Sequence, residues 1–360
     1  MKKINIFRLL GGKTQSKKSR TASFAIVILA YIIIQAISLS GNLPRLYASL
    51  LVPVCCYTVA AIGLNLNVGI SGELNLGQAG FMSIGAFTSA VVSGSLADAV
   101  PNAILRLIIA ILCGMVLAGL FGLVISIPVL KLQGDYLAIV TLAFGQIIMN
   151  IINNFYIGVD GAGLHFSFVE NTMQMGEGSK MLVSGPMGAV GIKTISTFTA
   201  GTILVLLALL VVYNVMDSRD GRAIMACRDN RIAAETVGIN VSRTKTMAFV
   251  ISSCMGGAAG ALYALNYSSI AATKFDFNTS ILILVYVVLG GLGNMTGTII
   301  ATALLLVLPE VLRFLSGYRM LIYAIVLIAI MLITNNDKVK VWIAGMKEKR
   351  NAKKGGEANV

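Results

Sequence analysis

Charged residues are scarce in this chain of 360 residues: they make up only 12%, against 57% hydrophobic residues. The mean hydropathy of +0.85 is correspondingly high. A soluble domain of this length needs far more charge to cover its surface, so these values exclude an ordinary soluble protein. Proline is also rare, with 6 residues against 37 glycines. This excludes a low-complexity chain and fits the glycine enrichment of closely packed transmembrane helices.

Residues that commonly bind metals are few. His165 is the only histidine, which excludes a multi-histidine metal site. The cysteines are Cys55, Cys56, Cys113, Cys227 and Cys254. Their spacing matches neither a zinc site nor a CxxC redox pair, and we interpret them as small apolar packing residues. We therefore expect neither a metal nor a cofactor in this chain.

The net charge of +13 is unevenly distributed. Basic residues gather in two tails and one internal loop, and the segments between them have very few. Nucleic acid binding is one interpretation of so basic a chain. Basic clusters between apolar runs are, however, the pattern that sets the orientation of membrane proteins. We therefore expect membrane lipid, and not nucleic acid, as the partner of this chain.

Apolar runs long enough to cross a bilayer recur along the sequence, since about 20 helical residues span the hydrocarbon layer. Ten membrane helices are predicted, which gives an all-α, polytopic fold. The predicted helices cover residues 21–40, 46–68, 77–95, 103–130, 136–156, 196–216, 245–267, 279–291, 296–312 and 320–334. The first is interpreted as a retained helix, because it is too long for a typical signal peptide and no clear cleavage site follows.

The positions of the basic segments support ten crossings. The tail at residues 1–20, the loop at residues 217–244 and the tail at residues 335–360 are the most basic segments. These three segments lie on one side of the membrane only if an even number of helices separates each from the next. Six predicted helices precede the loop and four follow it, which satisfies this condition. The sequence thus predicts both ends in the cytoplasm and a transmembrane domain over residues 21–334. The longest non-apolar stretch, residues 157–195, would then lie outside.

A polar run separates the second predicted helix from the third. It contains Asn65, Asn67, Glu73, Asn75 and Gln78. These groups cannot face lipid cheaply, since a carboxylate at the bilayer centre costs about 2.5–3.5 kcal/mol. Two interpretations stay open. The run is either a cytoplasmic turn, with Glu73 in water and the amides bonding to neighbouring helices, or a broken helix that lines a polar path.

Two later helices also carry polar side chains. Gln146 and Asn150 recur at helical spacing in the fifth predicted helix, which favours a stripe facing the interior or a pore. Packing between helices is the alternative. Glu310 could couple transport to protons, but its three-residue spacing from Arg313 favours an ion pair at the end of a helix.

The tetrapeptide GGKT at residues 11–14 is not a phosphate loop. The P-loop pattern needs a glycine five residues before the one that precedes the lysine, and this chain has Phe7 there. The tetrapeptide also lies in a basic tail, with no predicted strand before it. The chain therefore has no recognisable nucleotide site.

The cytoplasmic loop at residues 217–244 is predicted to contain a helix. Its alanines and Arg222 favour helix, and Gly238 with Asn240 would end it. A short amphipathic helix along the membrane surface is the physical expectation. A simple basic loop that only sets the topology is the alternative.

This loop resembles the coupling loop of bacterial ABC-importer permeases, whose motif is an EAA triplet, three further residues and then glycine. Ala233, Ala234 and Gly238 match the motif, and Ile232 replaces its glutamate, as is common in permeases of branched-chain amino acid importers. Three further blocks resemble that family in the same order: GLNLNVGISGELNLGQAGFMSIGAF, GDYLAIVTLAFGQI and VLGGLGNMTGTIIATALLLVLPEVLR. The GDYLAIVTLAFG block makes the resemblance one to M-type subunits.

The resemblance implies an ABC-importer permease fold in the cytoplasmic (inner) membrane, without enzymatic activity of its own. The implied partners are an H-type permease subunit, two ATP-binding subunits and an extracytoplasmic binding protein that delivers leucine, isoleucine or valine. ATP hydrolysis in the partners would drive alternating access. The coupling loop would dock on the ATPase through Gly221, Arg222, Arg228, Arg231, Ala233, Ala234 and Gly238. The arginines would pair with acidic residues there.

The polar residues are candidates for the translocation path. They are Asn65, Asn67, Glu73, Asn75, Gln78, Gln146 and Asn150. A path rich in amides and poor in charges suits a zwitterion, but it would also suit urea or an amide. An ion-coupled secondary transporter, with Glu73 or Glu310 in the coupling role, is an alternative from another class, and it would need no ATPase-docking helix.

Overall fold

The structure is a computed structural model. It describes residues 17–40, 44–97, 99–130, 134–160, 163–168, 180–313 and 318–335. The two predicted basic tails lie outside the described residues, apart from residues 17–20 and residue 335. The chain divides into two compact units, Met1–Ala303 and Leu304–Val360.

Ten apolar α-helices overlap the ten predicted spans. They are α2 (Lys17–Leu39), α3 (Arg45–Asn65), α4 (Gln78–Ser95), α5 (Ala103–Val129), α6 (Asp135–Asn153), α7 (Phe198–Asp217), α10 (Val241–Ala264), α11 (Phe277–Gly290), α12 (Met295–Val311) and α13 (Arg319–Asn335). Within the described residues, six helices are long and apolar enough to cross a membrane: α2, α3, α5, α6, α7 and α10. The chain is therefore a multi-pass membrane protein. Ten crossings, and the cytoplasmic position of both ends, stay predictions.

Helix α10 packs against α3, α4 and α5. Its buried face is built from small residues, which let helix backbones approach closely. A Cβ atom on Gly257, for example, would lie 2.7 Å from the carbonyl oxygen of Gly114 in α5. Further along the same helices, Cys56, Ala110 and Leu262 belong to one apolar cluster. The first unit therefore has a close-packed interior around α10.

The face of α5 away from this interior is apolar and exposed. Ile104 is 71% exposed and Val116 is 64% exposed. Exposed large apolar side chains of this kind mark a surface that contacts lipid or another protein. The exposed face of α5 thus agrees with a helix at the edge of a membrane domain.

A five-stranded antiparallel sheet occupies part of the predicted outside loop, and the sequence analysis did not predict it. The strands are β1 (Tyr156–Asp160), β2 (Gly163–Ser167), β3 (Lys180–Ser184), β4 (Ala189–Val190) and β5 (Ser269–Ile270). Their order in the sheet is β2-β1-β3-β4-β5. The last strand comes from the segment after α10, and its Ile270 pairs with Ala189 of β4. Strands this short give almost no alternation signal, so pattern reading missed them.

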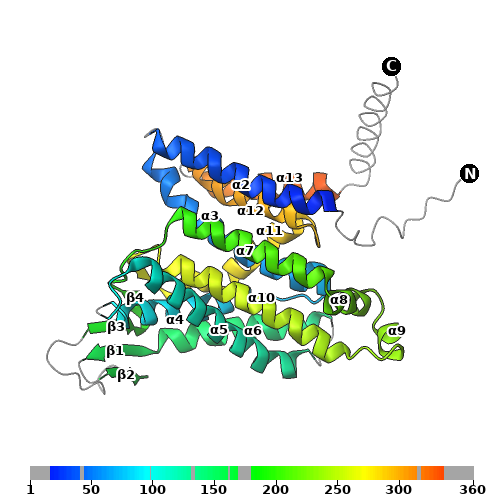
Figure 1. The fold of residues 1–360 in the computed structure, drawn as a ribbon, viewed down its shortest axis with the longest axis horizontal. Coiled ribbons are helices and arrows are strands. Elements are labelled where there is room, and N and C mark those ends of the chain that lie inside the picture. Colours follow the sequence, from blue (N-terminus) through cyan, green and yellow to red (C-terminus); the bar gives the residue numbers. More distant parts are fainter. Residues whose placement is uncertain are drawn as a thin grey trace, which may run out of the picture. The chain divides into compact units, whose positions relative to one another are not determined.

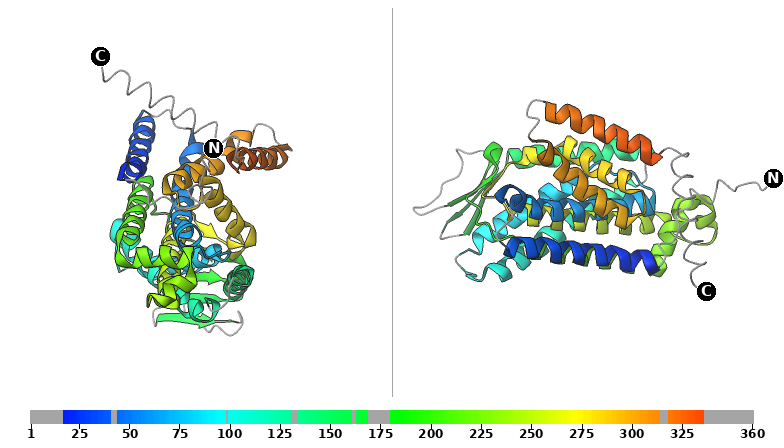
Figure 2. Two further views of the ribbon diagram at one scale, coloured as in Figure 1. Left: turned by 90° about the vertical axis from the view of Figure 1, so that its right-hand side faces the viewer. Right: turned by 90° about the horizontal axis from the view of Figure 1, so that it is seen from above.

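Two short helices, α8 (Arg219–Asp229) and α9 (Arg231–Thr236), connect α7 to α10. Two 3₁₀ turns, η3 (Gly185–Met187) and η4 (Ala272–Phe275), flank the sheet strands in the sequence. Figures 1 and 2 show the sheet at one end of the helices of the first unit and α8–α9 at the opposite end. The helices of this unit thus lie between the sheet and the α8–α9 segment.

The second unit contains the last residues of α12 and all of α13. Arg313 lies close to Glu310 three residues earlier, with 2.9 Å between Nη1 and Oε1. The predicted ion pair at the end of this helix is therefore confirmed. It gives Glu310 a structural partner.

Candidate functional site

The polar run after α3 forms a broken helix. Helix α3 continues directly into a π-helical turn, η1 (Leu66–Ser71). This turn ends at Gly72, whose φ of +77° is a left-handed conformation that favours glycine. Residues 72–77 then run without regular structure until α4 begins at Gln78. π-Helical turns of this kind occur frequently at functional sites.

All five polar side chains of this run are buried. Asn65, Asn67, Asn75 and Gln78 have no exposed surface, and Glu73 is 9% exposed. Glu73 forms an ion pair with Lys245, near the start of α10. Glu73 is therefore not in water, which contradicts that part of the first interpretation. The break in the helix agrees with the second interpretation.

The amides of this run bond to neighbouring helices. Nε2 of Gln78 donates to the carbonyl oxygens of Ala60 in α3 and Ser252 in α10, at 3.4 and 3.3 Å. Oδ1 of Asn75 accepts from the amide of Gly77 at 2.8 Å. Asn67 differs, since neither polar atom of its side chain has a hydrogen-bond partner among the described residues. Buried polar groups normally find partners, so Asn67 stands out.

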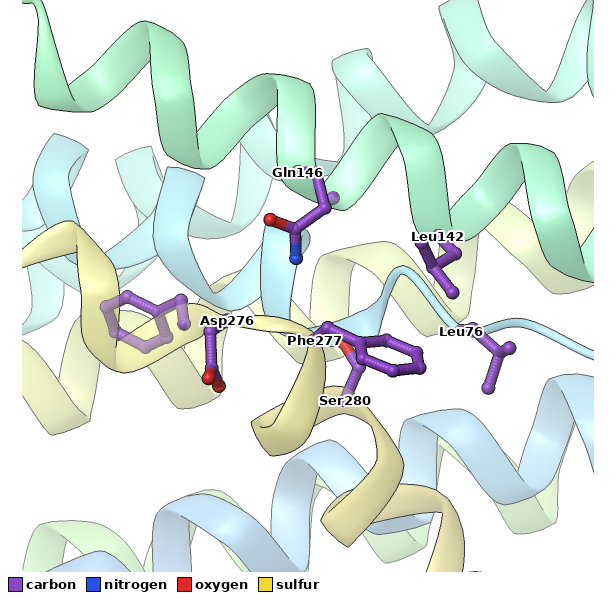
Figure 3. A pocket seen from close by; sticks show the side chains of 8 residues that line it. Leu76, Leu142, Gln146, Asp276, Phe277 and Ser280 are labelled. Carbon is purple, nitrogen blue, oxygen red and sulfur yellow. The ribbon is translucent and has the colours of Figure 1, made fainter.

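Gln146 and Asn150 do not share one environment. Gln146 lines a crevice, too narrow to admit a water molecule, with Leu76, Asp276 and Ser280 among its neighbours. Figure 3 shows its amide pointing from α6 toward the start of α11. Asn150, one turn further along α6, is exposed instead. The structure therefore brings Gln146, but not Asn150, beside the polar run.

The predicted coupling helix is two helices. Asn230 adopts an extended conformation between α8 and α9, and its side chain caps α9 by accepting a hydrogen bond from the amide of Ala233. Gly238, with a φ of +85°, ends α9 as predicted. The amides of Gly238 and Ile239 donate to the carbonyls of Glu235 and Ala234, which is the pattern of a Schellman motif. Asn240 does not help to end α9, because it caps the start of α10.

A small apolar cluster holds α8, α9 and α10 together. Cys227, Ala234 and Val241 are its buried members, and Ile239 packs against them. Burial raises the pKa of the Cys227 thiol above its ordinary value. Gly221 lies where α8 meets α7, and a side chain there would overlap the carbonyl oxygen of Val215. Gly221 and Ala234 thus serve packing, whereas Ala233 is exposed and Gly238 has open space around it.

The three predicted coupling arginines make different contacts. Arg222 is exposed, and its Nη1 donates to the carbonyl oxygen of Asp217 at 2.9 Å. Arg231 is exposed and pairs with Glu235 at 3.1 Å. Arg228 is directed inward instead, and its Nη1 donates to the carbonyl oxygen of Gly69 at 2.7 Å. Only Arg222 and Arg231 are therefore exposed to a partner.

Two exposed apolar residues lie beside these arginines and were not among the predicted site residues. Ile232 and Val237 are 75% and 81% exposed, on α9 and at its end. In a polar segment at the end of a membrane domain, two such side chains indicate a protein contact or a membrane surface. Their signal in the sequence is that they are apolar residues within a basic loop. Lys245, the partner of Glu73, also went unnoticed.

Comparisons with known proteins place this geometry in context. Residues 46–334 match the family described as "Branched-chain amino acid transport system / permease component". The chain is 32% identical to the high-affinity branched-chain amino acid transport system permease protein LivM of Salmonella typhimurium over 314 residues, which covers 84% of this chain and 72% of the relative. LivM of Escherichia coli gives 32% over 317 residues with the same coverage.

A relative with a different named solute is also similar. The fructose import permease protein FruG of Bifidobacterium longum is 26% identical over 286 residues, which covers 77% of this chain and 78% of that protein. No solved structure matches the chain significantly.

Proposed function

This chain belongs to the family of branched-chain amino acid transport permease components, and we propose that it is the M-type permease subunit of an ATP-driven importer for leucine, isoleucine and valine. It is a transport subunit rather than an enzyme. The identity of 32% to LivM over 84% of the chain carries the proposal. An H-type permease, two ATP-binding subunits and an extracytoplasmic binding protein complete the importer.

Coupling to the ATPase takes place through α9. Its exposed side chains Arg231, Ile232 and Val237 combine charge with apolar surface, a composition typical of a protein interface. Because ATP is hydrolysed in the partner subunits, its energy reaches this chain through a cytoplasmic surface element. The segment with α8 and α9 is the one that the family resemblance assigns to this task.

Both ends of the chain lie in the cytoplasm, and ten helices cross the membrane. A contact in the first unit supports the even number of crossings before α8. Arg20, at the start of α2, forms an ion pair with Asp217, the last residue of α7. The guanidinium of Arg20 also lies 5.2 Å from the ring centre of Tyr213. This proximity of the start of α2 and the end of α7 supports the proposal that both lie on one side of the membrane.

The solute moves along the buried polar run in alternating access. Asn67 and Gln146 are the side chains best suited to meet it. Asn67 has no partner among the described residues, and Gln146 lines the crevice beside the run. Asn65 and Gln78 bond to the surrounding helices, and Asn75 bonds within the run. Exposed Asn150 has no part in this path.

Uptake by cells tests the substrate. Deleting this chain should abolish uptake of labelled leucine, isoleucine and valine, and complementation should restore it. Labelled urea and fructose are measured in parallel, because urea fits an amide-rich path and FruG is a relative named for fructose. Retained leucine uptake with lost urea or fructose uptake would contradict the proposal.

A further inference from the structure

Two residues that flank α9 in the chain attach to one short piece of the broken helix, residues 69–73. Arg228, in the last turn of α8, donates from Nη1 to the carbonyl oxygen of Gly69 at 2.7 Å. Lys245, near the start of α10, forms an ion pair with Glu73. Helix α9, with its exposed apolar residues, lies between these two attachments in the chain.

The two attachments are shielded from solvent. The side chains of Glu73 and Lys245 are 11% and 14% exposed, and that of Arg228 is 25% exposed. Shielded charges are screened little by salt, and removing one partner leaves the other uncompensated. Arg228 and Lys245 are therefore partly or largely shielded in these contacts, whereas Arg222 and Arg231 are exposed.

The chemistry of the Arg228 contact fits the end of a helix. The last carbonyl groups of a helix lack partners within it, and a cation there also complements the helix dipole. The aliphatic part of Arg228 lies against Gly72, since a Cβ atom on Gly72 would lie only 2.6 Å from Cγ of Arg228. The absence of a side chain at Gly72 thus admits the arginine to this position.

On one side of these contacts, a buried cluster holds α8, α9 and the start of α10 together. On the other side, residues 69–73 lead to the polar run. The buried cluster of Cys227, Ala234 and Val241 joins α8, α9 and the start of α10. Residues 69–73 continue through residues 74–77 to Gln78, whose amide bonds to both α3 and α10. A displacement of α9 therefore acts on the polar run through two points.

We propose that Arg228 and Lys245 are positioning residues that transmit the movement of α9 to the broken helix, through the Gly69 carbonyl and the Glu73 carboxylate. This inference rests on the proposed function, since it needs an ATPase that moves α9. It also changes the role expected for Arg228, which pairs with the broken helix instead of with acidic residues of the ATPase.

The test measures how many leucine molecules are imported per ATP hydrolysed by the complete importer in proteoliposomes. Arg228→Met should lower this ratio about tenfold, the effect of losing one hydrogen bond to a charged group, while ATP hydrolysis continues. Arg228→Lys should recover part of the ratio. Arg219→Met is the matched control at an exposed position of the same helix, and it should leave the ratio unchanged.

The ion pair gives a second test that holds even where Arg228→Met fails to assemble. Glu73→Lys and Lys245→Glu alone should each lower the ratio, and the double variant should restore it. A ratio that stays normal in Arg228→Met, or that falls equally in Arg219→Met, would overturn the role of Arg228. A double variant no better than the single ones would overturn the role of Lys245. A wild-type importer that hydrolyses ATP but imports no leucine would instead count against the proposed function.

Discussion

The backbone amide of Gly293 donates a hydrogen bond to Oδ1 of Asn65, with 2.8 Å between the two atoms. Nδ2 of the same side chain donates to Oγ1 of Thr298, also at 2.8 Å. Asn65 thus joins the end of α3 to the turn before α12 and to α12 itself. This side chain, which the sequence suggested as part of a path, has its hydrogen-bonding groups occupied by neighbouring segments.

Asn65→Leu should destabilise the protein. The substitution leaves the Gly293 amide without its acceptor, and an unsatisfied buried group costs about 1–3 kcal/mol. The thermal unfolding midpoint of the purified chain in detergent measures the effect. Asn150→Leu is the control, because Asn150 is exposed on α6. Equal midpoints for the two variants would contradict the structural role of Asn65.

Gly238→Val should uncouple ATP hydrolysis from uptake. Gly238 ends α9 with a φ of +85°, and this left-handed conformation costs a residue with a side chain about 1–2 kcal/mol. Space is not limiting, since a Cβ atom there would meet no atom within 4 Å. Gly238→Asn should behave nearly like the wild type, because asparagine tolerates this conformation. Normal ATP-stimulated uptake by the valine variant in reconstituted vesicles would count against this role.

Ile232→Asp and Val237→Asp should weaken binding of the ATPase subunit. Burial of one such side chain in an interface is worth about 1.5–3 kcal/mol, so affinity should fall at least tenfold. Recovery of the ATPase on the tagged chain measures this. Thr236→Asp, which adds the same charge at an exposed position of α9, is the control. Unchanged recovery in both apolar variants would assign these side chains to the membrane surface.

The thiol of Cys227 should react slowly with a maleimide at neutral pH. Burial raises its pKa above the ordinary value of 9.0, so the reactive thiolate is rarer than in an exposed cysteine. Folding favours the neutral thiol, because the pKa of Cys227 is higher in the folded protein than in the unfolded chain. The stability that Cys227 contributes is therefore complete at pH values below 9.0 and declines as the pH rises above 9.0.

Peptide mass spectrometry after labelling measures the reaction rate in inside-out vesicles. Thr236→Cys supplies an exposed cysteine nearby as the reference. The rate at Cys227 should rise as pH is raised and stay below that of the reference. Equal rates at neutral pH would contradict the burial of Cys227 in the cluster that joins α8 to α10.

The purified chain alone should transport nothing. The proposed mechanism draws its energy from ATP-binding partners, and this chain has no recognisable phosphate loop. Liposomes that contain only this chain are loaded with buffer and exposed to labelled leucine. Accumulation of leucine above the level of empty liposomes would argue for a secondary transporter, and a dependence on a proton or sodium gradient would name its coupling ion.

The sequence located the helices well because long apolar runs carry a strong signal. It did not predict the sheet, because the strands have only two to five residues and β4 pairs with β5 across a long stretch of chain. The coupling segment was predicted as one helix, since helix propensity is continuous through α8 and α9. The break at Asn230 comes from the capping hydrogen bond that its side chain makes with α9.

The sequence by itself determined that the chain is a membrane protein and which family it resembles, because long apolar runs mark membrane helices and the blocks that carry the resemblance are contiguous. Only the tertiary structure decided what the polar residues do. Glu73 is 172 positions from Lys245, and Arg228 is 159 positions from Gly69. Contacts over such separations arise from helix packing, and a local pattern of residue types does not encode them. The sequence suggested that Arg228 is a surface charge, and the structure shows instead that it contacts the carbonyl oxygen of Gly69 in the broken helix.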